Sequence, residues 1–291
     1  MKHCFIYLDW NVIKDLKDNG KETEFYKIIT TLKSKYIVPY SFAHLCDLQK
    51  KLKAETIPLI QGDLNFFNEY SNGYMLGRDE DDYDISQQNI FSMYQEVAKY
   101  NLNLSPKFEI PEQIIEDFLV SGAENFLKVK ENVVYFIPLF YMAMDRFNCN
   151  PKLYNAFREV FKTTPETKEL QFLFNLQKKD ISYTELRELV DKYLNISSKH
   201  SNLLCDKLRN AYMLLDFNPV YREKVNNKTN FTNMYTDCEH MLNASHATYY
   251  ITKDRDTHSR TKFVYEAYGI KTQVFNKEEL IDYVLNGCKA D

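Results

Sequence analysis

Two short apolar segments near opposite ends of the chain each stop close to an aspartate. Residues 5–8 are followed by Asp9, and residues 249–252 are followed by Lys253 and Asp254. Runs of aromatic and β-branched residues favour strands. In an open α/β sheet, ligands bind just beyond the carboxyl ends of the strands. We therefore expect Asp9 and Asp254 to meet at one edge of a parallel sheet.

The two terminal segments alternate between strand and helix patterns, which predicts an α/β fold with right-handed crossovers. Ser41 is expected to be the N-cap of its helix, and Thr236 with Glu239 matches a capping box. Strands are expected at 4–8, 36–38, 248–252 and 271–275, and helices at 22–33, 41–52, 236–247, 261–268 and 277–285.

The middle of the chain has helical periodicity and almost no strand signal. The acid-rich segment 77–84 is expected to be a solvated turn between helices. We therefore predict a discontinuous α/β domain of residues 1–56 and 231–291, with an all-helical insertion of residues 57–230. Helices are expected in the insertion at 86–100, 111–128, 133–147, 151–161, 166–178, 184–194 and 200–215.

Composition narrows the class of protein. The net charge of −4 means that any attraction to nucleic acid must come from a local basic surface. Six cysteines occur without a Cys-x-x-Cys pair, so a zinc site and cysteine ligands are not indicated. The longest apolar run, residues 133–144, is too short to span a bilayer, and the N-terminus lacks a signal-peptide pattern. We expect a soluble cytoplasmic protein without membrane association.

Four stretches supply candidate ligands for a metal ion. Each has an ordinary alternative explanation as a helix cap, a polar helix face or a charged turn. Together they place acids at the ends of two strands and on two helices of the same expected fold. Two carboxylates ~4 Å apart repel by about 4 kcal/mol at an effective dielectric near 20, so a dication is the usual reason to gather them. The stretches are Asp9 with Asn11, Ser41 to Asp47 with His44, Asp237 with His240, and Thr252 to Asp256.

The order of these pieces resembles the PIN-domain ribonucleases. The resemblance is carried by Leu8-Asp9-Trp10-Asn11, Pro39-Tyr40-Ser41 before Asp47, Asp237-x-x-His240 and Ile251-Thr252-Lys253-Asp254. It covers about residues 1–56 and 231–291. It implies a three-layer α/β/α parallel sheet, an acidic metal site and an RNA phosphodiester substrate. The chain departs from the family at Asp47, where Glu is more common, and in its long insertion.

The hypothesis assigns each candidate a role. All-oxygen ligands suit Mg²⁺ or Mn²⁺, and we expect one or two ions bound by Asp9, Asp47, Asp237 and Asp254. Asp256 would assist as a ligand or outer base. The side chains expected to orient the ligands are Asn11, Ser41, His44, His240 and Thr252. The cations expected to contact RNA are Lys253, Arg255, Arg260 and Lys262.

Two other functions fit the same residues. A phosphatase with an aspartyl nucleophile also begins with a strand and an aspartate, but its chemistry needs a second acid where this chain has Asn11. Alternatively, the α/β part is a non-catalytic scaffold. The helical insertion would then bind a protein partner or mediate self-association.

Overall fold

The computed structural model describes residues 4–100, 175–196, 202–222 and 231–286, with a few isolated positions between 102 and 135. The chain divides into two compact units, residues 1–104 with 239–291 and residues 105–238. The first unit is thus built from both ends of the chain. Residues 57–104, which we assigned to the insertion, belong to the first unit, so its limits differ from those predicted.

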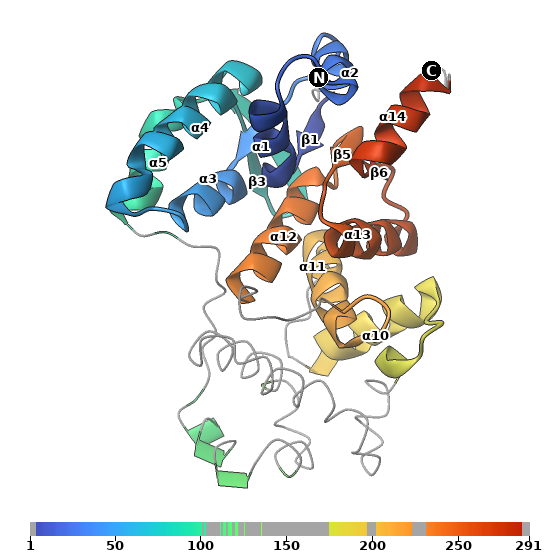
Figure 1. The fold of residues 1–291 in the computed structure, drawn as a ribbon. Helices are drawn as coiled ribbons and strands as arrows, with labels where there is room; N and C mark the ends of the chain where they lie inside the picture. The colour runs from blue at the N-terminus through green and yellow to red at the C-terminus, as the bar shows by residue number, and fades with distance from the viewer. Residues whose placement is uncertain are drawn as a thin grey trace. The chain divides into compact units, whose positions relative to one another are not determined.

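A three-stranded parallel sheet joins the two ends of the chain (Figure 1). Its strand order is β1-β5-β6, and the paired positions run from Ile6 opposite Tyr249 to Leu8 opposite Ile251. Every residue of β1 and β5 is buried, as expected for parallel strands covered on both faces. The parallel pairing predicted for these segments is confirmed. The strands are β1 (Ile6–Leu8), β5 (Tyr249–Ile251) and β6 (Gln273–Phe275).

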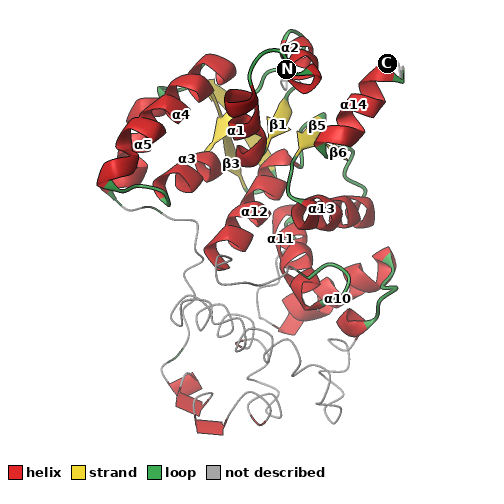
Figure 2. Cartoon of the chain, in the orientation of Figure 1, coloured by secondary structure: helices red, strands yellow, loops and turns green. Residues whose placement is uncertain are grey.

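A second sheet corrects the prediction for the acid-rich segment. Residues 74–87 form an antiparallel hairpin, not a turn between helices (Figure 2). Leu76 pairs with Ile85, and these two are the buried residues of the hairpin strands. The carboxylates around them hide the alternation of polar and apolar residues that marks a strand. The sheet contains β2 (Tyr40–Ser41), β3 (Tyr74–Asp79) and β4 (Asp82–Gln87).

The strand predicted at 36–38 is also corrected. Only Ile37 makes an isolated parallel bridge there, with Phe5. Pro39 has no N–H for a ladder, and β2 begins at the next residue, Tyr40.

Helices of the first unit include two that the sequence did not predict, α1 and α4. The helices expected at 22–33, 41–52 and 277–285 are confirmed within a few residues. Ser41 precedes α3 as its N-cap, as predicted. The elements are α1 (Trp10–Asn19), α2 (Glu24–Lys33), α3 (Phe42–Gln49), η1 (Ala54–Thr56), α4 (Ile57–Ser71), α5 (Ile90–Lys99), α13 (Arg255–Tyr268) and α14 (Lys277–Leu285).

The helix before β5 starts earlier than predicted. α12 (Phe231–Ala244) begins five residues ahead of Thr236, so Thr236 lies inside the helix and cannot cap it. Glu239 therefore does not serve as a capping-box acid. Its carboxylate instead accepts a hydrogen bond from Arg78 Nη2 on β3 at 2.8 Å.

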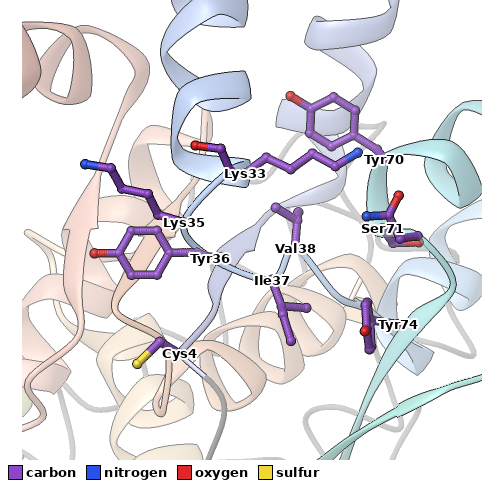
Figure 3. Close-up of a pocket in the computed structure, with 11 residues that line it drawn as sticks. Cys4, Lys33, Lys35, Tyr36, Ile37, Val38, Tyr70, Ser71 and Tyr74 are labelled. Atoms are coloured by element: carbon purple, nitrogen blue, oxygen red, sulfur yellow. The ribbon is translucent and has the colours of Figure 1, made fainter.

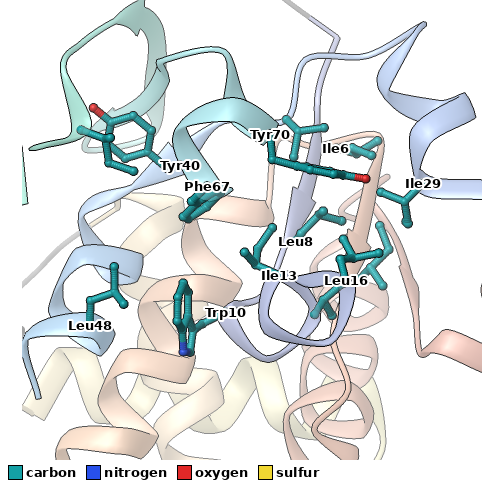
Figure 4. Close-up of a cluster of buried hydrophobic side chains, with 14 of the residues drawn as sticks. Ile6, Leu8, Trp10, Ile13, Leu16, Ile29, Tyr40, Leu48, Phe67 and Tyr70 are labelled. Carbon is teal, nitrogen blue, oxygen red and sulfur yellow. The ribbon is translucent and has the colours of Figure 1, made fainter. Parts of the chain in front are cut away.

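Alternate residues of the parallel sheet face opposite sides. Ile6 and Leu8 of β1, with Ile251 of β5, join the apolar cluster formed with α1, α2 and α4 (Figure 4). Tyr7 points to the other face, where its ring lies 5.8 Å from the ring of His240 on α12. The polar side chains of the candidate site are thus separated from the apolar cluster by the period-two geometry of one strand.

The second unit is helical in the part that the structure describes. The helices predicted at 184–194 and 200–215 are confirmed by α10 and α11, which pack against each other. The helices predicted between 111 and 178 lie almost entirely outside the described residues. Across the described segments, no helix has the length and apolar character needed to cross a bilayer. The elements are η3 (Asn175–Gln177), α10 (Tyr183–Ile196), α11 (Leu204–Leu214) and η4 (Leu215–Phe217).

Candidate active site

Asp9 and Thr252 meet at the carboxyl ends of β1 and β5. Leu8 pairs with Ile251, so Asp9 and Thr252, the residues that follow them, also lie side by side. The Asp9 N–H donates to the Ile251 carbonyl at 2.9 Å, and Thr252 Oγ1 donates to Asp9 Oδ2 at 2.7 Å. The two ends of the chain therefore share one edge of the sheet, as the sequence predicted.

The ordinary explanation for Asp9, that it caps a helix, does not account for its side chain. Asp9 occupies the N-cap position of α1, but its carboxylate accepts no capping hydrogen bond from that helix. The side chain is only 2% exposed, and its Oδ1 lies 3.9 Å from Nε2 of His240. A buried carboxylate is costly unless it is paired, so its position calls for another reason than helix capping.

Three carboxylates lie close enough to influence one another. Burial raises the pKa of Asp9, and the negative charges of Asp47 and Asp254 raise it further. The charge of His240 and the hydrogen bond from Thr252 oppose this shift of the pKa. Asp9, Asp47 and Asp254 thus form one electrostatic cluster, and their role as metal ligands stays a prediction.

Asp47 is held by two partners. His240 Nε2 donates to Asp47 Oδ2 at 3.0 Å, and Lys50 Nζ lies 3.0 Å from Asp47 Oδ1. Burial alone would raise the pKa of Asp47, but the His240 hydrogen bond and the Lys50 charge hold it below its ordinary value. Asp9 and Asp47 are therefore shifted in opposite directions, as at sites where two acids take different roles.

Tyr7 supports His240 from the other side of the imidazole. Its hydroxyl lies 2.8 Å from His240 Nδ1 and 2.7 Å from Ser41 Oγ. When the imidazole is neutral and Nε2–H donates to Asp47, Nδ1 accepts from Tyr7 and Ser41 donates to Tyr7. Sequence reasoning missed Tyr7, although its place between Ile6 and Leu8 in a strand signals that it faces the other way.

His44 has a structural role beside this network. Nε2–H donates to the Leu8 carbonyl at 2.8 Å, and Nδ1 accepts from the Ser41 N–H at 3.0 Å. His44 is fully buried, and burial lowers its pKa to about 3, so it is neutral. The sequence analysis expected His44 to orient the metal ligands. In the structure it ties the start of α3 to the end of β1.

The remaining predicted acids are placed differently. Asp254 is exposed, and its Oδ1 accepts from the Thr257 N–H at 2.7 Å as the N-cap of α13. Asp256 lies half-buried in the first turn of α13. Asp237 lies on α12 within the second unit, and its role as a ligand stays a prediction. Asn11 is exposed on α1.

The cations predicted to contact RNA are only partly available. Arg260 is 1% exposed and cannot reach an RNA backbone, so that prediction is wrong. Lys253 Nζ pairs with the buried carboxylate of Asp15 at 2.5 Å. Lys262 Nζ lies 3.9 Å from Glu279, and Arg255 is exposed at the start of α13. The basic surface beside Asp254 is therefore smaller than the sequence suggested.

The donor chemistry of the cluster suits a hard divalent cation, because carboxylate oxygens are the ligands that Mg²⁺ and Mn²⁺ prefer. A nearby dication would favour the ionised form of Asp9 and so oppose the rise in pKa that burial causes. Among the described residues, however, no set of three or more His, Cys, Asp or Glu side chains is arranged to hold a metal ion. Asp47 instead points one oxygen at His240 and the other at Lys50.

Two cavities among the described residues lie away from this cluster. The cavity in Figure 3, of about 390 Å³, is lined by Cys4, Lys33, Tyr36 and Tyr70 among others. It is near the residues that precede β1, whereas Asp9 follows β1. A second cavity lies between α2 and α14 and has a largely apolar lining that includes Tyr249 and Tyr283. Neither cavity contains any of the three carboxylates.

Comparisons with protein-family models, with curated protein sequences and with solved structures give no match for this chain.

Proposed function

We propose that this chain is a metal-dependent ribonuclease whose active site is the edge formed by the ends of β1 and β5. One observation carries the proposal. Asp9 is buried at the end of β1, makes no capping hydrogen bond to its own helix, and lies beside two further carboxylates. A fold gains no stability from clustering like charges, so a cation-dependent function is the simplest reason for this arrangement. The PIN-like three-layer architecture is part of the same proposal.

The proposed roles follow from the contacts. Asp9, Asp47 and Asp254 would supply oxygen ligands. Mg²⁺ or Mn²⁺, when bound, would lower the pKa of a water and neutralise charge on the scissile phosphate. Thr252 orients Asp9 by the 2.7 Å hydrogen bond to Oδ2. Such supporting contacts commonly set the affinity and geometry of ligands.

In the proposed active site, His240 also keeps Asp47 and Asp9 close to each other. Its imidazole lies between Asp47 and Asp9, at 3.0 Å and 3.9 Å from their oxygens. It thereby limits the separation of the two carboxylates while no cation is bound. Asp256 would assist as a ligand or outer base.

The test is cleavage of a fluorescent single-stranded RNA in Mg²⁺ or Mn²⁺. Asp9→Asn and Asp254→Asn should each abolish cleavage while the circular dichroism spectrum is unchanged, and EDTA should abolish cleavage by the parent protein. Asp18→Asn is the matched control, because Asp18 is an exposed acid on α1. Cleavage at the parent rate by both site variants would refute the assignment. Titration calorimetry that detects no Mn²⁺ binding would favour the non-catalytic scaffold.

A further inference from the structure

The side of the site formed by α1 and α3 carries two lysines, Lys14 and Lys51, that form no ion pair with a carboxylate in the part of the chain that the structure describes. Lys51 Nζ lies over the ring of Trp10, 5.0 Å from its centroid. Trp10 directly follows Asp9, and Lys51 lies four residues after Asp47. The Trp10 ring therefore holds the Lys51 ammonium near Asp9 and Asp47 through a cation–π contact.

Lys14 belongs to the same group. It lies one helical turn after Trp10 on α1, so the two side chains share a helix face. Lys14 is exposed. Burial, followed by the charge of Lys14, lowers the pKa of Lys51, while Asp47 and Asp63 act in the opposite direction. Both ammonium groups therefore belong to the side of the site that carries Trp10.

The nearby acids are already engaged by other lysines. Lys50 pairs with Asp47 at 3.0 Å, and Lys17 pairs with Asp63 at 2.5 Å. Within the described segments, no ion pair joins Lys14 or Lys51 to a carboxylate. Because Lys14 and Lys51 lie beside the proposed active site without paired carboxylates, they favour the binding of an anionic ligand.

The opposite side of the site lacks this excess. Lys253 is engaged by Asp15, Arg260 is buried, and Lys262 lies near Glu279. Only Arg255 is exposed there with no ion pair in the described part of the chain. The two sides therefore differ in the charge that they can offer to a substrate.

We propose that Lys14 and Lys51 bind the phosphate backbone of the RNA strand, so that the strand enters over Trp10 on the α1 and α3 side of the carboxylates. This inference rests on the proposed ribonuclease function and names the substrate contacts of that site. Lysines recognise phosphates as point charges, without regard to base sequence. The contacts should therefore set affinity and salt dependence, not sequence preference.

The experiment measures binding without cleavage. Fluorescence anisotropy of a labelled single-stranded RNA is recorded with the full-length Asp9→Asn protein in EDTA, over a series of salt concentrations. Lys14→Gln and Lys51→Gln remove the charges but keep long side chains. Each lost phosphate contact should lower the slope of log affinity against log salt by about 0.7, which is about fivefold in affinity at ~0.1 M salt. The double variant should lose about 25-fold.

Three controls make the result specific. Lys51→Arg keeps the charge and should retain affinity within about twofold, because guanidinium also binds phosphates. Lys271→Gln removes an exposed lysine from the segment before β6 and should bind as the parent does. Arg255→Gln with Lys262→Gln tests the α13 side and should cost less than the Lys14 and Lys51 pair.

The outcomes separate this inference from the proposed function. If RNA binds through Lys14 and Lys51 but the wild-type protein does not cleave it in Mg²⁺ or Mn²⁺, the nuclease proposal is refuted and the binding surface is kept. If the Lys14→Gln, Lys51→Gln double variant binds RNA with the same affinity and salt slope as the Asp9→Asn protein, the proposed binding surface is overturned. This holds even if the wild-type protein cleaves RNA. If the Asp9→Asn protein shows no measurable RNA binding, the proposed binding surface is also overturned.

Discussion

His240 on α12 donates a hydrogen bond to Asp47 on α3 at 3.0 Å, although 193 residues separate them in the sequence. The imidazole is fully buried and its other nitrogen lies 2.8 Å from the Tyr7 hydroxyl. A carboxylate on one helix is thereby positioned through a side chain of a second helix and a strand. Each member of this chain of contacts can be tested separately.

Removal of the Tyr7 hydroxyl should weaken the fold while the ring is kept. Tyr7→Phe leaves His240 Nδ1 and Ser41 Oγ without their shared partner, which should lower the free energy of unfolding by about 1–2 kcal/mol in urea titrations. Tyr94→Phe is the matched control, because the buried Tyr94 hydroxyl has no hydrogen-bond partner among the described residues. Equal effects of the two substitutions would contradict the proposed support of His240.

Asp9→Asn should raise stability at neutral pH in the absence of divalent cations. Because the folded pKa of Asp9 lies above its unfolded value, ionisation of Asp9 costs stability as pH rises through this interval. Asn cannot ionise, and its oxygen can still accept from Thr252. The difference in melting temperature from the wild type should be small near pH 3.5 and grow toward pH 7. A stability loss at pH 7 would show that the Asp9 charge is already compensated.

Asp15→Asn should have the opposite pH dependence. Asp15 is buried and accepts hydrogen bonds from Lys253 and Lys277, at 2.5 Å and 3.1 Å. Burial opposes ionisation, but these two lysines lower the pKa of Asp15, so its contribution is present at neutral pH and lost as pH falls through the folded pKa. We expect a loss of about 2 kcal/mol at pH 7 that shrinks in acid. A difference that persists unchanged at low pH would exclude this explanation.

Mn²⁺ should stabilise the wild-type protein against urea. A ligand that binds only the folded state at 100 times its dissociation constant adds about 2.7 kcal/mol. The gain should vanish in Asp9→Asn and remain in Asp18→Asn, whose exposed acid lies on the same helix. The same gain in all three proteins would mean that the cation binds elsewhere.

The strand ends could be predicted because their signals are local. Apolar runs that stop at Asp9 and Thr252 identify parallel strands, and parallel pairing brings their ends together. The contact between His240 and Asp47 could not be predicted in the same way. It depends on the rotation of α12 about its axis, and the start of that helix was placed five residues late, at Thr236.

Two other predictions were wrong because they relied on the average behaviour of residue types. Arginine is mostly exposed in folded proteins, so Arg260 was expected on the surface, where a substrate could reach it, but it is buried. The hairpin of β3 and β4 was missed since Leu76 and Ile85 are its only fully buried side chains among many charged neighbours. In both cases tertiary packing overrides the local preference.

The pairing of β1 with β5 also bears on how this protein folds. The Thr252 hydroxyl and the Asp9 carboxylate are joined by a hydrogen bond across 243 positions of the sequence. Contacts of such long sequence separation carry a large loop-closure entropy and form late in folding. The proposed site would therefore be assembled only when both segments have folded together, and a fragment that lacked either segment would have no such site.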